Sequence, residues 1–234
     1  MNVRLLWPLL LCGALSAGCA STSSTELTQS GFLSDYSKLQ PDPDDPSARL
    51  YVKSGVDWRQ YQKVLLEPIR VWVKDDADYK GVDPTELKAL TDHFQQALVR
   101  ALEPTYPVVS QPGPGVLRVR VAITDLVPTQ PQVSVATVVV PFGSVASMAA
   151  NTAGLSHLGQ TAIEAEFLDS QTHQVLAAFM DRNVGRKFNF SQGVSGAINS
   201  YGNAFNTWAF ARAAFDAWAQ LLRRRLDEAH RQPR

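Results

Sequence analysis

The alternation of apolar and polar positions in the middle of the chain predicts a β-sheet. In residues 116–126 the apolar side chains occupy every second position, at Leu117, Val119, Val121 and Ile123. A period of two residues places them on one face of a strand, with charged or small side chains on the other face. We therefore expect a half-buried strand here, the clearest in the sequence.

Two further regions have the composition of strands. Residues 63–73 are rich in apolar and β-branched side chains, but Pro68 removes one backbone donor. This strand is therefore expected to be bulged or to lie at a sheet edge. Residues 161–168 and 175–184 flank a polar segment and predict a hairpin.

Two segments have the 3.6-residue period of amphipathic helices. The first is expected to be capped by Asp83, because Pro84 and Glu86 follow it at favoured positions, and to end before Pro104. The second covers about residues 203–229. Their apolar stripes are Leu87, Leu90, Phe94, Leu98 and Ala101 in the first, and Ala204, Trp208, Ala211, Phe215, Trp218, Leu222 and Leu226 in the second.

Together these elements predict an α/β (α+β) fold. We expect a single domain with an antiparallel or mixed sheet of four to five strands and two main helices packed on one face.

The N-terminus has the features of a bacterial lipoprotein signal. Arg4 precedes an apolar core in residues 5–15, and small residues lead to Gly18 and Cys19. This apolar segment is too short to span a bilayer. We expect cleavage after Gly18 and lipidation of Cys19, although Ser16 stands where such signals prefer leucine. The alternative is an ordinary cleavable signal in which Cys19 has no role.

The expected domain organisation follows from this signal. Residues 1–18 are the signal peptide, residues 19–30 a lipidated flexible tether, and residues 31–234 a single periplasmic α/β domain. The residue after Cys19 is Ala20 and not aspartate, which in similar Gram-negative lipoproteins implies the outer membrane. The other cysteine, Cys12, leaves with the signal, so no disulfide is expected. Residues 41–46 contain three carboxylates but lack calcium-loop spacing, so we expect a solvated turn.

The charge balance argues against nucleic acid as a partner. The chain has 22 Lys and Arg against 22 Asp and Glu, whereas a nucleic-acid or anionic-membrane surface needs a basic patch. We therefore expect the membrane to be reached through the lipid anchor.

Spacings typical of metal or catalytic sites are not found. The histidines, His93, His157, His173 and His230, are far apart in sequence. Residues 193–196 lack the spacing of a nucleophile elbow, and residues 112–115 lack the lysine of a phosphate loop. We expect no metal, no cofactor and no enzymatic activity.

Three features remain as weaker candidates for a site. Glu164 and Glu166 share one strand face and could form a carboxylate pair, although partial exposure to solvent is the expected role. Residues 126–163 contain no Asp, Glu, Lys or Arg and form either core or a docking surface. The aromatic residues that could stack on sugars, but by default pack at a sheet edge, are Trp58, Tyr61, Trp72 and Tyr79.

The order of several motifs resembles a known family. These motifs are residues 30–37, residues 55–58 with Tyr61 and Lys63-Val64, and the hairpin residues Asp169, Thr172, Asp181 and Arg182. They are similar to those of uncharacterised Gram-negative lipoproteins of the domain of unknown function 3313. His173 departs from that pattern, since similar hairpins carry glycine there, but histidine tolerates a left-handed turn comparatively well.

The resemblance implies a location and a class but no activity. The expected function is that of a membrane-anchored cell-envelope lipoprotein, non-catalytic and acting through protein–protein contacts. The alternatives are a hydrolase or transferase acting on envelope glycans, or a peptidoglycan-binding module.

Overall fold

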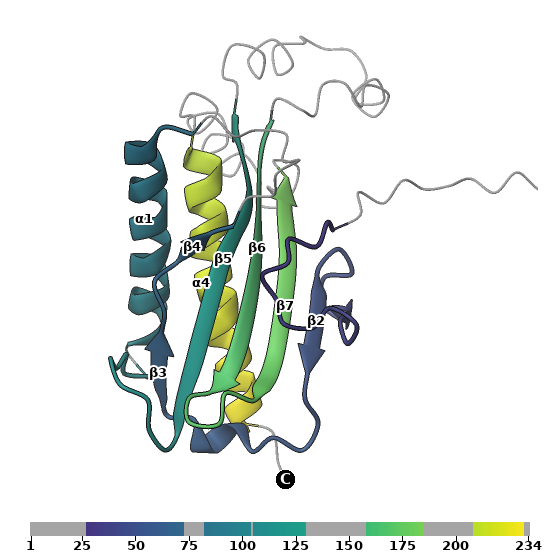
Figure 1. Ribbon diagram of the computed structural model, residues 1–234, viewed down its shortest axis with the longest axis vertical. Helices are drawn as coiled ribbons and strands as arrows, with labels where there is room; N and C mark the ends of the chain where they lie inside the picture. Colours follow the sequence, from purple (N-terminus) through teal and green to yellow (C-terminus); the bar gives the residue numbers. More distant parts are fainter. Residues whose placement is uncertain (1–26, 73–81, 104, 130–157, 185–207, 232–234) are drawn as a thin grey trace, which may run out of the picture.

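A seven-stranded mixed sheet forms the centre of the molecule, which we describe from a computed structural model (Figure 1). The structure describes residues 27–72, 82–103, 105–129, 158–184 and 208–231. The strand order is β1-β2-β7-β6-β5-β3, and β4 also pairs with β5. The strands are β1 (Gln40–Pro41), β2 (Arg49–Val52), β3 (Lys63–Leu66), β4 (Arg70–Val71), β5 (Val116–Thr129), β6 (Leu158–Asp169) and β7 (Val175–Val184).

The α+β class and the mixed sheet agree with the sequence, but the expected four to five strands were too few. The expected edge strand over residues 63–73 is divided by Pro68 into β3 and β4, both parallel to β5. β1 and β2 were missed, because two and four residues are too short to show a period. The turn between them was expected to be solvated, yet Asp42 in it is only 3% exposed.

The predicted hairpin is confirmed and its turn explains one departure from the family pattern. β6 and β7 pair antiparallel along most of their length. His173 has φ 60°, the left-handed conformation for which glycine is usually needed. Asp169 stabilises this turn by accepting hydrogen bonds from the backbone N–H groups of Gln171 and Thr172 at 3.0 and 2.8 Å.

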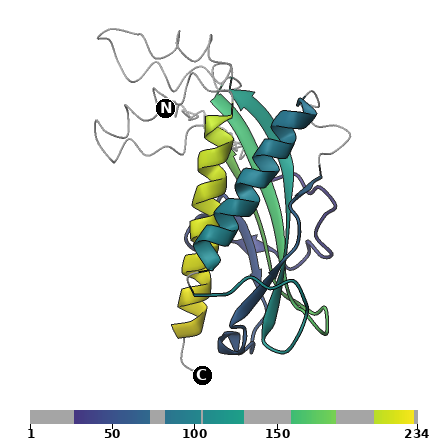
Figure 2. The same ribbon diagram turned by 90° about the vertical axis from the view of Figure 1, so that its left-hand side faces the viewer.

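Two long helices, α1 (Pro84–Leu102) and α4 (Ala209–Arg231), lie side by side on one face of the sheet (Figure 2). The Asp83 cap is confirmed, since its side chain accepts hydrogen bonds from the N–H groups of Thr85 and Glu86. Phe94 and Phe215 stack between the helices with ring centroids 4.5 Å apart. A short 3-10 helix, η1 (Trp58–Gln60), contacts the same side of the molecule.

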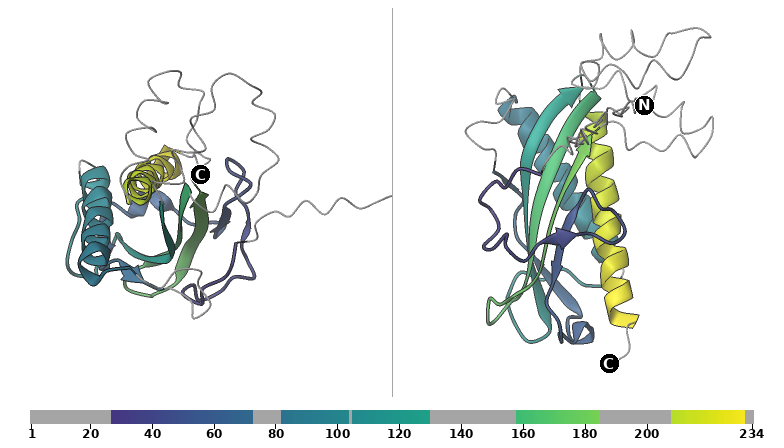
Figure 3. Two further views of the ribbon diagram at one scale, coloured as in Figure 1. Left: turned by 90° about the horizontal axis from the view of Figure 1, so that it is seen from above. Right: turned by 90° about the vertical axis from the view of Figure 1, so that its right-hand side faces the viewer.

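The opposite face of the sheet carries the beginning of the described chain. Viewed from above, the helices and residues 27–39 lie on different sides of β5, β6 and β7 (Figure 3). A main apolar core fills the helix side, and a small cluster of Phe32, Leu33, Ala122 and Ala178 lies on the other side. The two faces therefore differ in what covers them.

Several expectations concern residues outside the described ranges. These are the signal, Gly18 and Cys19, Tyr79, His157, residues 193–196, the start of the last helix at 203–207 and the middle of the charge-free stretch. The ends of that stretch are described: Thr129 pairs with Leu158 on adjacent strands.

Candidate functional site

The carboxylate pair suggested by the sequence lies at the centre of the sheet and is buried. Glu164 and Glu166 are 0% and 1% exposed, which overturns the expected partial exposure to solvent. Sequence spacing placed them correctly on one strand face. It could not reveal the cover, which comes from residues more than a hundred positions earlier in the chain.

The cover is formed by residues 30–38, which we call the N-terminal strap. The Ser30 backbone N–H and hydroxyl each donate to a different oxygen of Glu164, both at 2.8 Å. The Tyr36 hydroxyl donates to Glu164 at 2.6 Å and accepts from the N–H groups of Gly31 and Leu33. The buried charge of Glu164 therefore faces donors of the strap.

Glu166 is held by both the strap and a neighbouring strand. Ser34 donates to it from its backbone N–H at 2.5 Å and also from its hydroxyl. Arg120 on β5 pairs with its other oxygen at 2.6 Å. Arg120 also lies 3.8 Å from Glu67 and stacks over the Phe32 ring, 4.9 Å from the centroid. Hydrogen bonds and an opposite charge together compensate this burial.

Small residues beside the glutamates give the strap room to approach the sheet. Ala122 is the partner of Glu164 in the β5–β6 register, and Ala178 is the partner of Glu166 in the β6–β7 register. Both alanines pack against Phe32 and Leu33 in the small apolar cluster. A larger side chain at either alanine would hold the strap away from the carboxylates.

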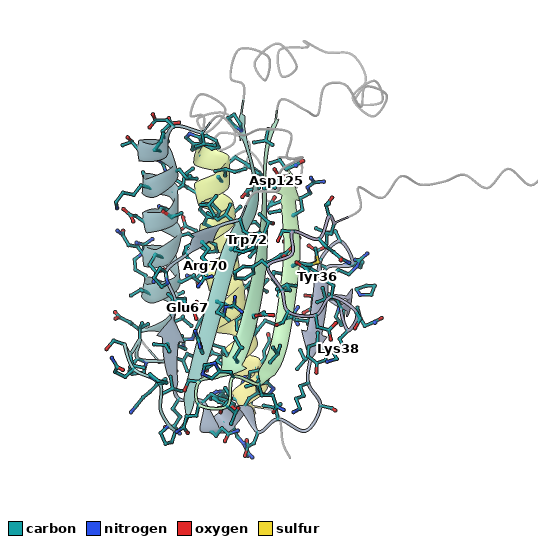
Figure 4. All side chains as sticks on the ribbon, viewed as in Figure 1. Tyr36, Lys38, Glu67, Arg70, Trp72 and Asp125 are labelled. Atoms are coloured by element: carbon teal, nitrogen blue, oxygen red, sulfur yellow. The ribbon has the colours of Figure 1, made fainter. Side chains whose placement is uncertain are left out.

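Trp72 fixes the end of the strap that is nearest to the expected tether. Its indole N–H donates to the Ser30 carbonyl at 3.2 Å, and its ring meets Phe32 edge to face at 6.0 Å. Figure 4 labels Trp72, Tyr36 and Glu67, which lie on this face of the sheet. Trp58 packs with the main core on the helix side, so Trp58 and Trp72 do not form one row for stacking on sugars.

A second candidate site is a groove between α4 and the sheet. It has a cavity volume of about 200 Å³ and is lined by Val121, Ile163 and Phe167 on the sheet and by Trp218 and Leu222 on α4, among others. The α4 residues that line it extend from Trp218 to Ala229, a length of about 16 Å along the helix axis. An apolar cavity of about 150 Å³ is large enough to bind benzene. We call this feature the apolar groove.

The polar residues of the groove lining are Asp42, Arg225 and Glu228, and two of them bind each other. Arg225 on α4 contacts both oxygens of Asp42 at 2.8 and 3.0 Å, and Asp44 at 2.7 Å. Val52, which also lines the groove, is 50% exposed, so the groove opens toward solvent beside β2. No sequence signal identified this groove, because its lining comes from elements distant in the chain.

Two buried tyrosines have strongly perturbed acidity, and both have structural partners. Burial, together with a hydrogen bond to Asp169, raises the pKa of Tyr61 to about 12. Burial and a hydrogen bond to Asp227 likewise raise the pKa of Tyr106 to about 12. Each tyrosine is held in its neutral form and joins two distant segments.

The described histidines do not gather into a metal site. His93 lies 3.1 Å from Asp216 on α4, His173 contacts Arg118, and His230 packs edge to face on Tyr106. Within the described ranges no group of three or more His, Cys, Asp or Glu has an arrangement suited to a metal ion. None of the helices described there is long and apolar enough to cross a membrane.

The sequence over residues 28–222 matches the model of a family described as "Protein of unknown function (DUF3313)". This chain belongs to that family. The motifs that suggested the resemblance therefore have a place in the structure: residues 30–37 are part of the strap, Asp181 accepts from the Trp218 indole at 2.8 Å, and Arg182 pairs with Asp125 at 3.0 Å. The contacts of Asp181 and Arg182 thus join elements of the fold to one another.

Other comparisons add little. No curated protein matches the sequence. Among solved structures, a PelC dodecamer from Paraburkholderia phytofirmans has a TM-score of 0.36 at 9% identity, covering 74% of this chain and 96% of that chain. A variant of that dodecamer has a TM-score of 0.33 at 10% identity, covering 70% of this chain and 95% of that one. These similarities are too weak to carry an argument about assembly or function.

Proposed function

We propose that this chain is a lipid-anchored protein of the Gram-negative outer membrane that faces the periplasm and acts without catalysis, by contact with other envelope proteins. The observation that carries the proposal is the closure of the Glu164–Glu166 pair by the strap. A glycosidase needs two carboxyl groups that reach substrate. Here the chain's own donors occupy both groups.

The same closure suits a protein held by its N-terminus. Ser30 follows the proposed acceptor Cys19 by eleven residues, which span at most about 40 Å when extended. Tension on that tether acts first on the strap. Because the strap is bonded to the central strand β6 and to Trp72, the sheet bears this tension and the N-terminal residues of the domain stay attached.

Lipid labelling in cells tests the anchor. Cells are fed an alkynyl fatty acid, and incorporation is compared between the unmodified protein, Cys19→Ala and the matched control Cys12→Ala. We expect label in the unmodified protein and in Cys12→Ala and none in Cys19→Ala. Incorporation that persists in Cys19→Ala would show that the anchor is elsewhere.

Crosslinking tests the proposed contact with envelope proteins, and an activity assay tests the proposed lack of catalysis. Crosslinking in intact cells followed by purification from membranes should give defined adducts with envelope proteins, and these should be lost in Cys19→Ala. Purified protein incubated with peptidoglycan should release no soluble fragments. Release that disappears in Glu164→Gln or Glu166→Gln would instead identify an envelope hydrolase.

A further inference from the structure

The apolar groove has the shape of a site for a chain-like molecule. Its lining follows α4 for about three turns, from Trp218, which packs beside Phe94, to Ala229. The sheet strands β5, β6 and β7 form the opposite wall through residues such as Val121, Ile163 and Phe179. An apolar space that follows a helix for this length accommodates an extended flexible chain better than a compact ring system.

The polarity of the groove restricts the ligand further. Between Trp218 and Leu222 the lining side chains are apolar, so a polar ligand group placed there would lose its hydrogen bonds to water without replacement. At the opening, the single cation Arg225 is already paired with Asp42 and Asp44, and Glu228 adds a further negative charge. This polar end of the groove, the rim, thus has two lining carboxylates, Asp42 and Glu228, for one guanidinium, and Asp44 is a further carboxylate bonded to that guanidinium.

We propose that the apolar groove binds one hydrocarbon chain, such as the acyl chain of a lipid, with a neutral or cationic head group at the rim. The chain enters beside Val52 and lies between α4 and β6. The acyl chain can come from a separate lipid or from the protein's own anchor at Cys19. Only the second source rests on the proposed function.

A displacement assay tests the binding itself. The full chain carrying Cys19→Ser is purified without detergent, and N-phenyl-1-naphthylamine serves as a neutral fluorescent probe. We expect probe fluorescence to rise on binding, and dodecan-1-ol to displace the probe more effectively than dodecanoate, because the acidic rim disfavours an anionic head group. Absence of probe binding, or equal displacement by octanesulfonate, would overturn the proposal.

Groove variants locate the site. Ala177 is buried and lines the groove, so Ala177→Leu should fill it and weaken probe binding by about tenfold. Leu222→Gln provides a second test, since it places an amide in the lining from a helix position that is only partly buried. Ala217→Leu, on the exposed side of α4, is the matched control and should bind as the parent chain does. Circular dichroism confirms folding, and unchanged binding in folded Ala177→Leu and Leu222→Gln would exclude this groove.

Photo-crosslinking separates the two sources of the chain. Cells are fed an alkynyl fatty acid that carries a diazirine, irradiated, and peptides from β6 and α4 are examined for acyl adducts. Adducts that persist in Cys19→Ser indicate a separate lipid, whereas adducts confined to the protein with Cys19 indicate its own anchor. Acylation of Cys19 is read in the same experiment, so an unlabelled Cys19 with groove adducts would refute the anchor while leaving the groove proposal intact. No groove adduct in either protein would refute the groove proposal.

Discussion

The two faces of the sheet are covered in opposite ways. On one face, a short strap brings hydroxyl and amide donors to two buried carboxylates. On the other, two helices cover the strands with apolar side chains and leave a groove of about 200 Å³. The strap face depends on a few directional bonds that must all be satisfied, whereas the helix face depends on many small contacts and tolerates an unfilled space.

The two faces should therefore differ in how strongly substitutions lower stability. Removing one partner from a buried ionic network leaves another charge without compensation, which costs more than losing the bond itself. A substitution that changes the size of a side chain on the helix side alters packing that already leaves the apolar groove unfilled. Substitutions on the strap face should therefore lower stability most.

The largest expected effect is that of Arg120→Met. It leaves the buried Glu166 without its cation and should lower the free energy of unfolding by about 3 kcal/mol. Chemical denaturation monitored by circular dichroism measures this. Arg118→Met is the matched control and should cost about 1 kcal/mol, because its partner Glu67 is more exposed and has other cations nearby. Glu166→Gln removes the uncompensated charge but keeps an oxygen that can accept from Ser34. If the double variant Arg120→Met with Glu166→Gln is no more stable than Arg120→Met alone, the ionic network is not the cause.

A smaller loss is expected for Tyr36→Phe. Without the hydroxyl, Glu164 loses one donor and the N–H groups of Gly31 and Leu33 lose their acceptor, at a cost of about 2 kcal/mol. Ser37→Ala on the same strap is the control and should cost less than about 0.5 kcal/mol, since Ser37 is exposed and, within the described ranges, its hydrogen bonds go to Asp35 of the strap itself. Equal effects in the two variants would show that the strap is not held through Glu164.

The smallest effect concerns alkaline pH and the helix side. Tyr61 and Tyr106 both have a pKa raised to about 12, so the folded state keeps the proton that the unfolded chain releases near pH 10. Their stabilising contribution is fully present below pH 10 and is lost as the pH rises toward 12; at pH 10.5 the loss is on the order of 1 kcal/mol per tyrosine. Stability measured from pH 8 to 11 should fall less steeply in Tyr61→Phe and in Tyr106→Phe. If stability falls with pH as steeply in both variants as in the parent chain, Tyr61 and Tyr106 do not cause the alkaline loss of stability.

The sequence by itself determined the elements whose signals are local. Asp83 and Pro84 define the start of α1, the alternation from Leu117 to Ile123 identifies β5, and Pro68 accounts for the division between β3 and β4. The spacing of Glu164 and Glu166 also placed them on one face. Each of these features follows from the conformational preferences of neighbouring residues or from the period of a strand or helix.

The tertiary structure decided how those elements are used. Burial of the two glutamates depends on donors from Ser30, Ser34 and Tyr36, and burial of Asp42 depends on Arg225, more than 180 positions later. The groove exists only because α4 lies across strands from three other parts of the chain. Periodicity says which face of an element is apolar or polar, but not which distant segment covers that face, because that is set by packing of the whole chain.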